Sequence, residues 1–165
     1  MRVPSVARKL CSLLARVLPS NALRIACQRA CGARIGAHVY LGYEVLIDPA
    51  CPELIEIEDG ARIGHGVIIL GHNRPADVWL EHLGEQRAPV RIGRQAAVYA
   101  GAIIMPGVRV GQCAIVREGA VVDREVPDGT VVAGVPARIV EALPLHRLRR
   151  AAESPRTEPM PTAKR

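Results

Sequence analysis

Aliphatic residues recur at every sixth position through most of this 165-residue chain. Three runs carry the repeat: Ile35, Leu41, Ile47; Ile57, Ile63, Ile69; and Ile92, Val98, Ile104, Val110, Val116, Val122. Four residues after each of these positions stands a small apolar residue, and Asn73 is the one exception. A period of six matches neither the 3.6 residues of a helix nor the two of a plain strand. It predicts a short strand and a turn that repeat.

Three such units would close one triangular coil, and stacked coils would pair their strands in parallel about 4.8 Å apart. The interior of such a prism is narrow, so it favours Ile, Val and Ala over rings. The composition agrees, because 49% of the residues are hydrophobic while only 2% are aromatic and Phe is absent. The repeat therefore predicts an all-β solenoid, a parallel β-helix whose ends need caps.

The repeat divides the chain into three predicted segments. Residues 1–32 form a short N-terminal helical cap, since apolar residues follow helical spacing over 5–18 and a second helix over 21–31 ends at Gly32. Residues 33–140 form the solenoid, which is interrupted by a polar, protruding loop over 71–89. Residues 141–165 form a helical turn and a disordered basic tail, because the end is rich in Pro and charge.

The net charge of +6 belongs to the two ends of the chain. Residues 1–34 hold seven basic groups and no acidic one, whereas the body of the chain is acidic. An acidic body with few rings argues against nucleic-acid binding. The basic N-terminal helix is either an end cap or a peripheral contact with an anionic membrane surface.

Cysteine usage and hydropathy predict the compartment. The five cysteines form no CxxC pair, so neither a disulfide framework nor a zinc site is expected, and they are interpreted as small packing residues. No apolar run approaches the length of a membrane span, and basic residues interrupt the N-terminal stretch where a secretory signal would be apolar. We expect a cytoplasmic protein, with an organellar transit peptide as the alternative.

The pattern [Ile/Leu/Val]-Gly-x-x-x-x resembles the hexapeptide repeat of the left-handed parallel β-helix acyltransferases. Gly71-His72, Ile92-Gly93 and Pro106-Gly107-Val108 follow one another as in the galactoside and maltose O-acetyltransferase type. The resemblance implies acetyl transfer from acetyl-CoA to a hydroxyl of a sugar or sugar-like acceptor. It also implies a homotrimer with sites between subunits, and no required metal.

By this resemblance, His72 is the general base, which suits an imidazole near neutral pH. His82, inside the loop, is the second candidate for that role. Asp48 would contact the acceptor or orient the histidine, although an Asp that caps the turn before Pro49 explains it equally well.

Further residues would shape the acceptor site. The family's Trp-Ile-Gly-Ser motif corresponds to Tyr99-Ala100-Gly101-Ala102, so the main chain of Ala102 would replace the serine in binding the oxyanion. Tyr99 takes the place of the tryptophan. Trp79 is interpreted either as a lid over the acceptor or as an anchor against the neighbouring subunit.

The CoA contacts implied by the resemblance lie in the C-terminal coils. Arg124 and Arg138 match basic positions of the family and would meet the phosphates. Glu118 and Gly119, like Gly101, would contribute backbone contacts only.

Three other functions stay open at this point. One is a serine or amino-sugar acetyltransferase, whose VAGVPARIV-like ending this chain shares. Another is a metal enzyme of the γ-carbonic anhydrase type, although His65 and His72 are seven residues apart where that type needs five. The third is a non-enzymatic trimeric scaffold. Nothing in the loop over 71–89 names the acceptor.

Overall fold

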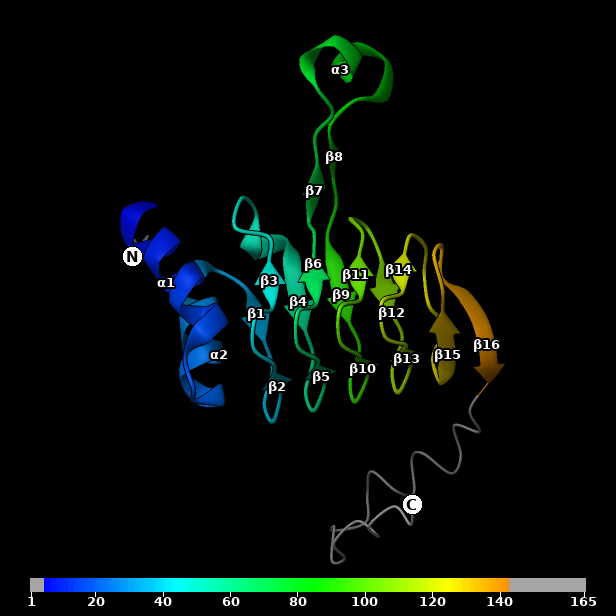
Figure 1. The fold of residues 1–165 in the computed structure, drawn as a ribbon, viewed down its shortest axis with the longest axis horizontal. Coiled ribbons are helices and arrows are strands. Elements are labelled where there is room, and N and C mark those ends of the chain that lie inside the picture. Colours follow the sequence, from blue (N-terminus) through cyan, green and yellow to red (C-terminus); the bar gives the residue numbers. More distant parts are fainter. Residues whose placement is uncertain (1–4, 143–165) are drawn as a thin grey trace, which may run out of the picture.

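The computed structural model describes residues 5–142, which form a prism of stacked coils with two helices at one end (Figure 1). Face 1 consists of the parallel strands β1 (Arg34–Ile35), β4 (Ile55–Ile57), β9 (Val90–Ile92) and β12 (Arg109–Val110). Face 2 consists of the parallel strands β2 (Tyr40–Leu41), β5 (Arg62–Ile63), β10 (Ala97–Val98), β13 (Ile115–Val116) and β15 (Thr130–Ala133), followed by the antiparallel β16 (Arg138–Ala142). Face 3 consists of the parallel strands β3 (Leu46–Ile47), β6 (Ile68–Ile69), β11 (Ile103–Ile104) and β14 (Val121–Val122).

The period of six builds the core of this prism. Successive coils align the predicted aliphatic positions in columns, as in Ile47↔Ile69, Ile69↔Ile104 and Ile104↔Val122 on face 3. All twelve positions of the repeat are buried, with at most 8% of any residue exposed. The predicted triangular, parallel solenoid is therefore confirmed.

Two glycines of one turn serve different needs. Gly64 packs against the next coil, where an added Cβ would lie 2.8 Å from the backbone nitrogen of Ala100. At Gly66 an added Cβ would meet only the backbone nitrogen of Gly101, at an ordinary contact distance of 4.0 Å, but the φ of +66° is a left-handed conformation that costs most side chains free energy.

This difference gives a stability prediction. We expect Gly64→Ala to lower the free energy of unfolding by about 1–3 kcal/mol, because the coils must move apart. Gly66→Ala should cost about 1–2 kcal/mol, and Gly66→Asn should cost less because Asn tolerates this conformation. Urea unfolding of the four Ala and Asn variants at the two positions checks this. At Gly64 we expect Asn to cost more than Ala, because Asn is larger. If Gly64→Asn were more stable than Gly64→Ala, close packing would not explain the glycine at this position.

The predicted helical cap is present as α1 (Ser5–Val17) and α2 (Asn21–Cys31). Gly32 ends α2 as expected, with a φ of +119°. Arg24 ties α2 to the first coil, because its buried guanidinium donates hydrogen bonds to the carbonyl oxygens of Leu41, Leu18 and Pro19. The end of the core is thereby covered.

Several basic residues of the cap are engaged within the protein. Arg16 pairs with Glu44, and Arg29 donates to the carbonyl oxygens of residues 35 and 36. One row of α1 nevertheless leaves apolar side chains exposed: Leu10, Leu13, Leu14 and Val17. Membrane contact through this helix stays a prediction. Among residues 5–142, no helix combines the length and the hydropathy needed to cross a bilayer.

The C-terminal boundary differs slightly from the prediction. β16 folds back on β15 and continues to Ala142, two residues beyond the expected end of the solenoid at 140. Val131 is in register with the outward Ile115 of face 2, yet it is only 5% exposed where β16 pairs with β15. The predicted helical turn and tail, from residue 143 onward, lie outside the described residues.

The interruption over 71–89 forms an arm that projects from the prism (Figure 1). Its stem is the antiparallel pair β7 (His72–Asn73) and β8 (Gln86–Arg87), and its tip is the helix α3 (Asp77–Leu83). α3 has no buried residue, and Val78 and Leu83 are among its exposed apolar side chains. The arm therefore has apolar side chains that this chain alone does not cover.

Candidate active site

His72 lies where the arm leaves the prism, at the corner between faces 3 and 1. We call this the histidine corner; it comprises residues 48–54, 70–72, 105–107 and 123–125 of successive coils. Gly71 precedes the histidine and packs against Cys51, since an added Cβ would lie 2.8 Å from that Sγ. This close approach brings the backbone of residues 71 and 72 within reach of the coil below.

Asp48 and His72 form a hydrogen-bonded pair at this corner. His72 Nδ1 lies 2.5 Å from Asp48 Oδ2. A carboxylate can only accept, so Nδ1 carries the proton and Nε2 carries the free lone pair. Within the described part of the chain Nε2 has no hydrogen-bond partner, and the His72 side chain is 33% exposed. The ring is thus oriented to accept a proton from outside.

Asp48 itself is buried, with 1% of the residue exposed. Backbone N–H groups of Gly71 and His72 donate to Oδ2, and that of Ala50 donates to Oδ1. Burial alone would raise the pKa of this carboxyl, but the hydrogen bonds, chiefly that from His72, outweigh it and lower the pKa below its ordinary value. Asp48 therefore stays ionised and contacts the histidine, and the acceptor-contact alternative has no exposed carboxylate to support it.

The lowered pKa of Asp48 has a consequence for stability. A carboxyl whose folded pKa lies below its ordinary value of 3.8 contributes stability above that pH, and the contribution is lost as pH falls through the folded pKa. Asp48→Asn would leave buried N–H groups facing an amide, so we expect a loss of about 1–3 kcal/mol at pH 7. The gap between wild type and variant should narrow below pH 3.8 in urea unfolding curves. A gap that stays constant from pH 7 to pH 3 would contradict the assignment.

Cys51 is the residue of this corner that the sequence does not single out. Its repeat position predicts only packing, and its side chain is indeed buried. Yet its thiol donates to Asp48 Oδ2 at 3.3 Å, and its Sγ lies 3.8 Å from His72 Nδ1. Burial raises the pKa of Cys51 to about 11, with further contributions from Asp48, so the thiol is protonated and a poor nucleophile.

The two residues predicted on the loop lie on the arm, away from the pair. Trp79 and His82 are both on α3, with ring centroids 6.3 Å apart. Trp79 is 56% exposed. Within one chain, neither residue contacts His72, so their predicted roles depend on what the arm meets.

Other predicted residues lie at a second corner, between faces 2 and 3. We call it the glycine corner; it comprises residues 64–66, 99–102 and 117–120. Gly101 and Gly119 turn the chain there with φ of +69° and +65°, and an added Cβ on either would meet nothing within 4 Å. Tyr99 and Glu118 are exposed beside them, and Glu118 pairs with Arg117. Ala102 points into the core, and its N–H makes a long 3.3 Å hydrogen bond to the Tyr99 carbonyl.

Arg124 and Arg138, the predicted phosphate contacts, line one hollow of about 350 Å³ at the C-terminal end of the prism. Its walls include the apolar side chains of Val122 and Val126. Both guanidinium groups pair with Asp123, at 3.0 Å and 3.8 Å. The hollow thus offers two cations and an apolar wall on the coils that follow the histidine.

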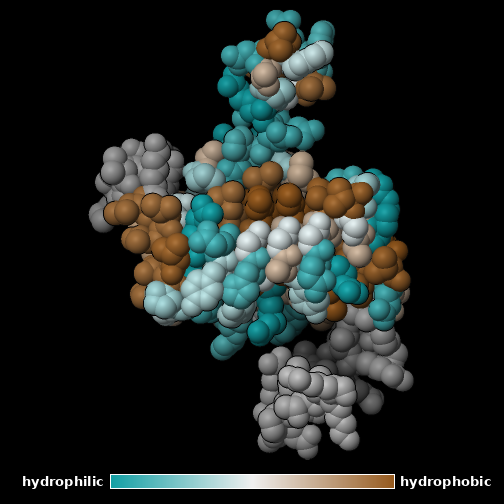
Figure 2. Space-filling model, viewed as in Figure 1, coloured by the Kyte–Doolittle hydropathy of each residue, from teal (hydrophilic) through white to brown (hydrophobic). Residues whose placement is uncertain are grey.

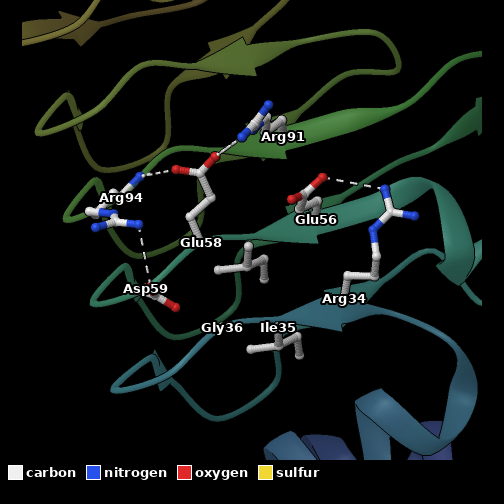
Figure 3. Close-up of a pocket in the computed structure, with 9 residues that line it drawn as sticks. Arg34, Ile35, Gly36, Glu56, Glu58, Asp59, Arg91 and Arg94 are labelled. Carbon is white, nitrogen blue, oxygen red and sulfur yellow. Dashed lines mark hydrogen bonds and ion pairs between the residues drawn. The ribbon is translucent and has the colours of Figure 1, made fainter.

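A larger hollow of about 410 Å³ lies on face 1 and is unsuited to this chemistry (Figure 3). Charged side chains line it in pairs that link neighbouring coils: Arg34–Glu56, Arg91–Glu58 and Arg94–Asp59. Since every one of these groups is paired across the strands, the cluster is best explained as a ladder that neutralises the outer surface of face 1.

His65 does not join His72. Its Nδ1 accepts a hydrogen bond from the Tyr43 N–H at 3.0 Å, and its ring stacks on Tyr43 with centroids 5.5 Å apart. The histidine pair that a γ-carbonic anhydrase type of site would need is therefore not formed in the described part of the chain.

The period of six and the three parallel faces define this chain as a hexapeptide-repeat β-helix protein. Nodulation protein L of Rhizobium meliloti (strain 1021) is 39% identical over 115 residues, which cover 68% of this chain and 61% of that protein. The putative acetyltransferase YvoF of Bacillus subtilis (strain 168) is 34% identical over 108 residues, 65% of this chain and 59% of that protein. The chain thus spans about three fifths of the length of these relatives. No family model matches it.

Solved structures agree on the fold. The hexapeptide-repeat acetyltransferase VCA0836 from Vibrio cholerae matches with a TM-score of 0.67 and 22% identity, over 85% of this chain and 90% of that one. The chain therefore has the left-handed parallel β-helix fold of the hexapeptide-repeat acetyltransferases, and the resemblance predicted from its repeat is confirmed.

Proposed function

We propose that this protein is an acyl-CoA-dependent O-acyltransferase, with acetyl-CoA as the donor and a sugar or sugar-like hydroxyl as the acceptor. The observation that carries the proposal is the Asp48–His72 pair, which leaves Nε2 free to accept a proton. The names of the relatives support the reaction class, and VCA0836 has been crystallised with acetyl coenzyme A.

The transfer follows from this geometry. His72 Nε2 takes the proton of the acceptor hydroxyl while the oxygen attacks the thioester carbonyl. The tetrahedral intermediate then collapses, the carbon–sulfur bond breaks, and the proton returns from the imidazolium to the CoA thiolate. The buried Asp48 carboxylate stabilises the imidazolium through Nδ1–H and holds the ring in place.

The intermediate also needs a donor for its oxyanion. The backbone N–H of Ala102 at the glycine corner is our candidate for that donor, because its bond to the Tyr99 carbonyl is long at 3.3 Å, whereas the N–H of Gly101 donates to the His65 carbonyl at 2.9 Å. The glycine corner lies at a different edge of the same prism from His72, because face 3 separates the two corners. One chain alone therefore does not bring the proposed base and the proposed oxyanion donor together.

The outer surface of face 3 suits contact between subunits, which would bring His72 of one subunit close to the glycine corner of another. Its outward side chains align along the prism and are all aliphatic and only partly exposed: Leu46, Ile68, Ile103 and Val121. An apolar band runs beneath the arm in Figure 2. The equivalent positions of face 1 are charged instead, as at Arg34, Glu56 and Arg91. We infer a homotrimer in which face 3 of each subunit packs against its neighbours.

In such a trimer the histidine corner of one subunit meets the glycine corner of the next, since both corners border face 3. The CoA would lie along this seam, with its phosphates near Arg124 and Arg138 and its backbone contacts at Glu118 and Gly119. The arm, with Trp79 and His82, would reach over the acceptor or against the neighbouring subunit. Tyr99 would line the acceptor side.

An amine acceptor is the second candidate. A tetrahydropyridine dicarboxylate N-acetyltransferase from Staphylococcus aureus (strain bovine RF122 / ET3-1) is 39% identical over 80 residues, although this chain covers only 30% of it. A base at His72 could deprotonate an ammonium group as well as assist a hydroxyl.

The test is release of CoA thiol from acetyl-CoA with purified protein, measured across matched sugars and amino sugars. Turnover with neutral sugars supports the O-acyltransferase proposal. Turnover confined to amino sugars would replace it with N-acyl transfer. Absence of CoA binding by calorimetry would favour a non-enzymatic trimer.

A further inference from the structure

Three different metal-binding atoms converge at the histidine corner. Asp48 Oδ2, Cys51 Sγ and His72 Nδ1 all lie within 4.8 Å of one another. Their separations are 2.5 Å between oxygen and nitrogen, 3.3 Å between oxygen and sulfur, and 3.8 Å between nitrogen and sulfur. Zn²⁺ bonds nitrogen and oxygen at about 2.0–2.2 Å and thiolate sulfur at about 2.3 Å, so one ion reaches all three atoms once the hydrogen-bonded Asp48 Oδ2 and His72 Nδ1 move slightly apart.

We propose that Asp48, Cys51 and His72 form a site for Zn²⁺ or a similar borderline-soft divalent cation, and that binding there blocks the base. The mixed sulfur, nitrogen and oxygen set suits Zn²⁺ better than Mg²⁺ or Ca²⁺, which take oxygen ligands. With three protein ligands, a fourth position is left for water.

The surroundings preorganise these ligands. The N–H groups of Ala50, Gly71 and His72 hold the Asp48 carboxylate, in the way that outer hydrogen bonds orient metal ligands. Asp48 and Cys51 belong to one coil and His72 to the next, so the rigid stack fixes their spacing. Asp48 and Cys51 are buried and only the His72 side chain is partly exposed, so a cation would enter beside the His72 ring.

The proton balance explains the expected inhibition. The metal binds Nδ1, so the ring proton moves from Nδ1 to Nε2, and the Cys51 thiol releases its proton to solvent. Nε2 then carries a hydrogen and has no lone pair for a substrate proton. Metal binding and action as a base therefore exclude each other. This inhibition rests on the proposed function, whereas the binding does not.

Binding is tested first, on the full chain without substrate. Cobalt(II) titration should give the near-ultraviolet band of a thiolate–cobalt bond, and calorimetry with Zn²⁺ should give one site per chain. Cys51→Ser and Cys51→Ala should each weaken Zn²⁺ binding by about tenfold or more. Two substitutions of Cys51 are used so that the result does not depend on the folding of a single variant.

The matched control removes a second pair of thiols. Cys11 and Cys27 interact with each other in the helical cap, so Cys11→Ser combined with Cys27→Ser should leave the Zn²⁺ affinity unchanged if the site is at Cys51. No thiolate band, or an affinity that both Cys51 variants retain, would overturn the site. If the site binds Zn²⁺ and the enzyme turns over, Zn²⁺ should inhibit at the same concentrations. Turnover that persists in the Zn²⁺-saturated protein would overturn the blocking role alone.

Discussion

Replacing His72 with alanine should lower kcat for acyl transfer by about 10²–10⁴-fold, the usual contribution of a positioned base. The KM for acetyl-CoA should change little, because the proposed CoA contacts lie on other coils. The measurement is steady-state release of CoA thiol at saturating acceptor. The large effect follows from the hydrogen bond between Asp48 and His72, which leaves Nε2 as the proton acceptor.

His82→Ala is the matched control for this prediction. His82 is also a histidine of the 71–89 segment, but it lies on α3, and no contact links it to Asp48. We expect its kcat at saturating acceptor to stay within a few-fold of wild type, and the loss of an arm contact with the acceptor to change only the KM for the acceptor. If His82→Ala were inactive and His72→Ala active, the base would be on the arm and the assignment of His72 would be wrong.

The second large effect concerns assembly. Ile103→Arg should convert the proposed trimer to monomers and abolish turnover, since it places a charge in the apolar surface of face 3. Burying each such aliphatic side chain contributes about 1.5–3 kcal/mol, and an unpaired buried charge costs more. Light scattering gives the mass and the thiol assay gives the activity.

Ala97→Arg provides the control for assembly. Ala97 precedes an inward Val98 on face 2, just as Ile103 precedes an inward Ile104 on face 3, so both side chains point outward from neighbouring strands of one coil. We expect this variant to remain trimeric and active. An Ile103→Arg protein that stays trimeric would show that face 3 is not the interface.

The fold could be predicted from the sequence because the repeat is local. Positions six residues apart report directly on the inward column, and Ile92 through Val122 appear in the structure in the predicted register. The end of α2 could be predicted at Gly32 for an equally local reason. The residue that ends the helix adopts a left-handed conformation, and glycine is the residue that most easily adopts it.

The site could be predicted only in part. His72 stands out because it follows Gly71 where the repeat breaks, but Asp48 and Cys51 lie more than 20 residues earlier. Their closeness depends on how the coils stack, and the repeat position of Cys51 gives no sign of a hydrogen bond. Arg24 is similar, because a count of basic residues gives no indication that this guanidinium is buried under the first coil.

The arm could also be predicted from the sequence only in part. Its polar composition predicts a projecting loop, and it does project, but its tip is the helix α3. Val78 and Leu83 fit that helix, yet they stay exposed in one chain. Under the proposed function these side chains contact a neighbouring subunit or the acceptor, and neither contact is encoded in a local sequence pattern.

Subunit mixing tests most directly the central claim, a site shared between His72 of one subunit and the glycine corner of the next. Gly101→Asp is suited to block that corner, because Asp tolerates its φ of +69° and an added Cβ meets nothing within 4 Å. His72→Ala and Gly101→Asp should each be inactive alone. After the two are unfolded and refolded together in equal amounts, about one quarter of the sites should pair an intact His72 with an intact Gly101 across a subunit boundary. We therefore expect activity near a quarter of wild type. A mixture as inactive as its two components would contradict the shared site.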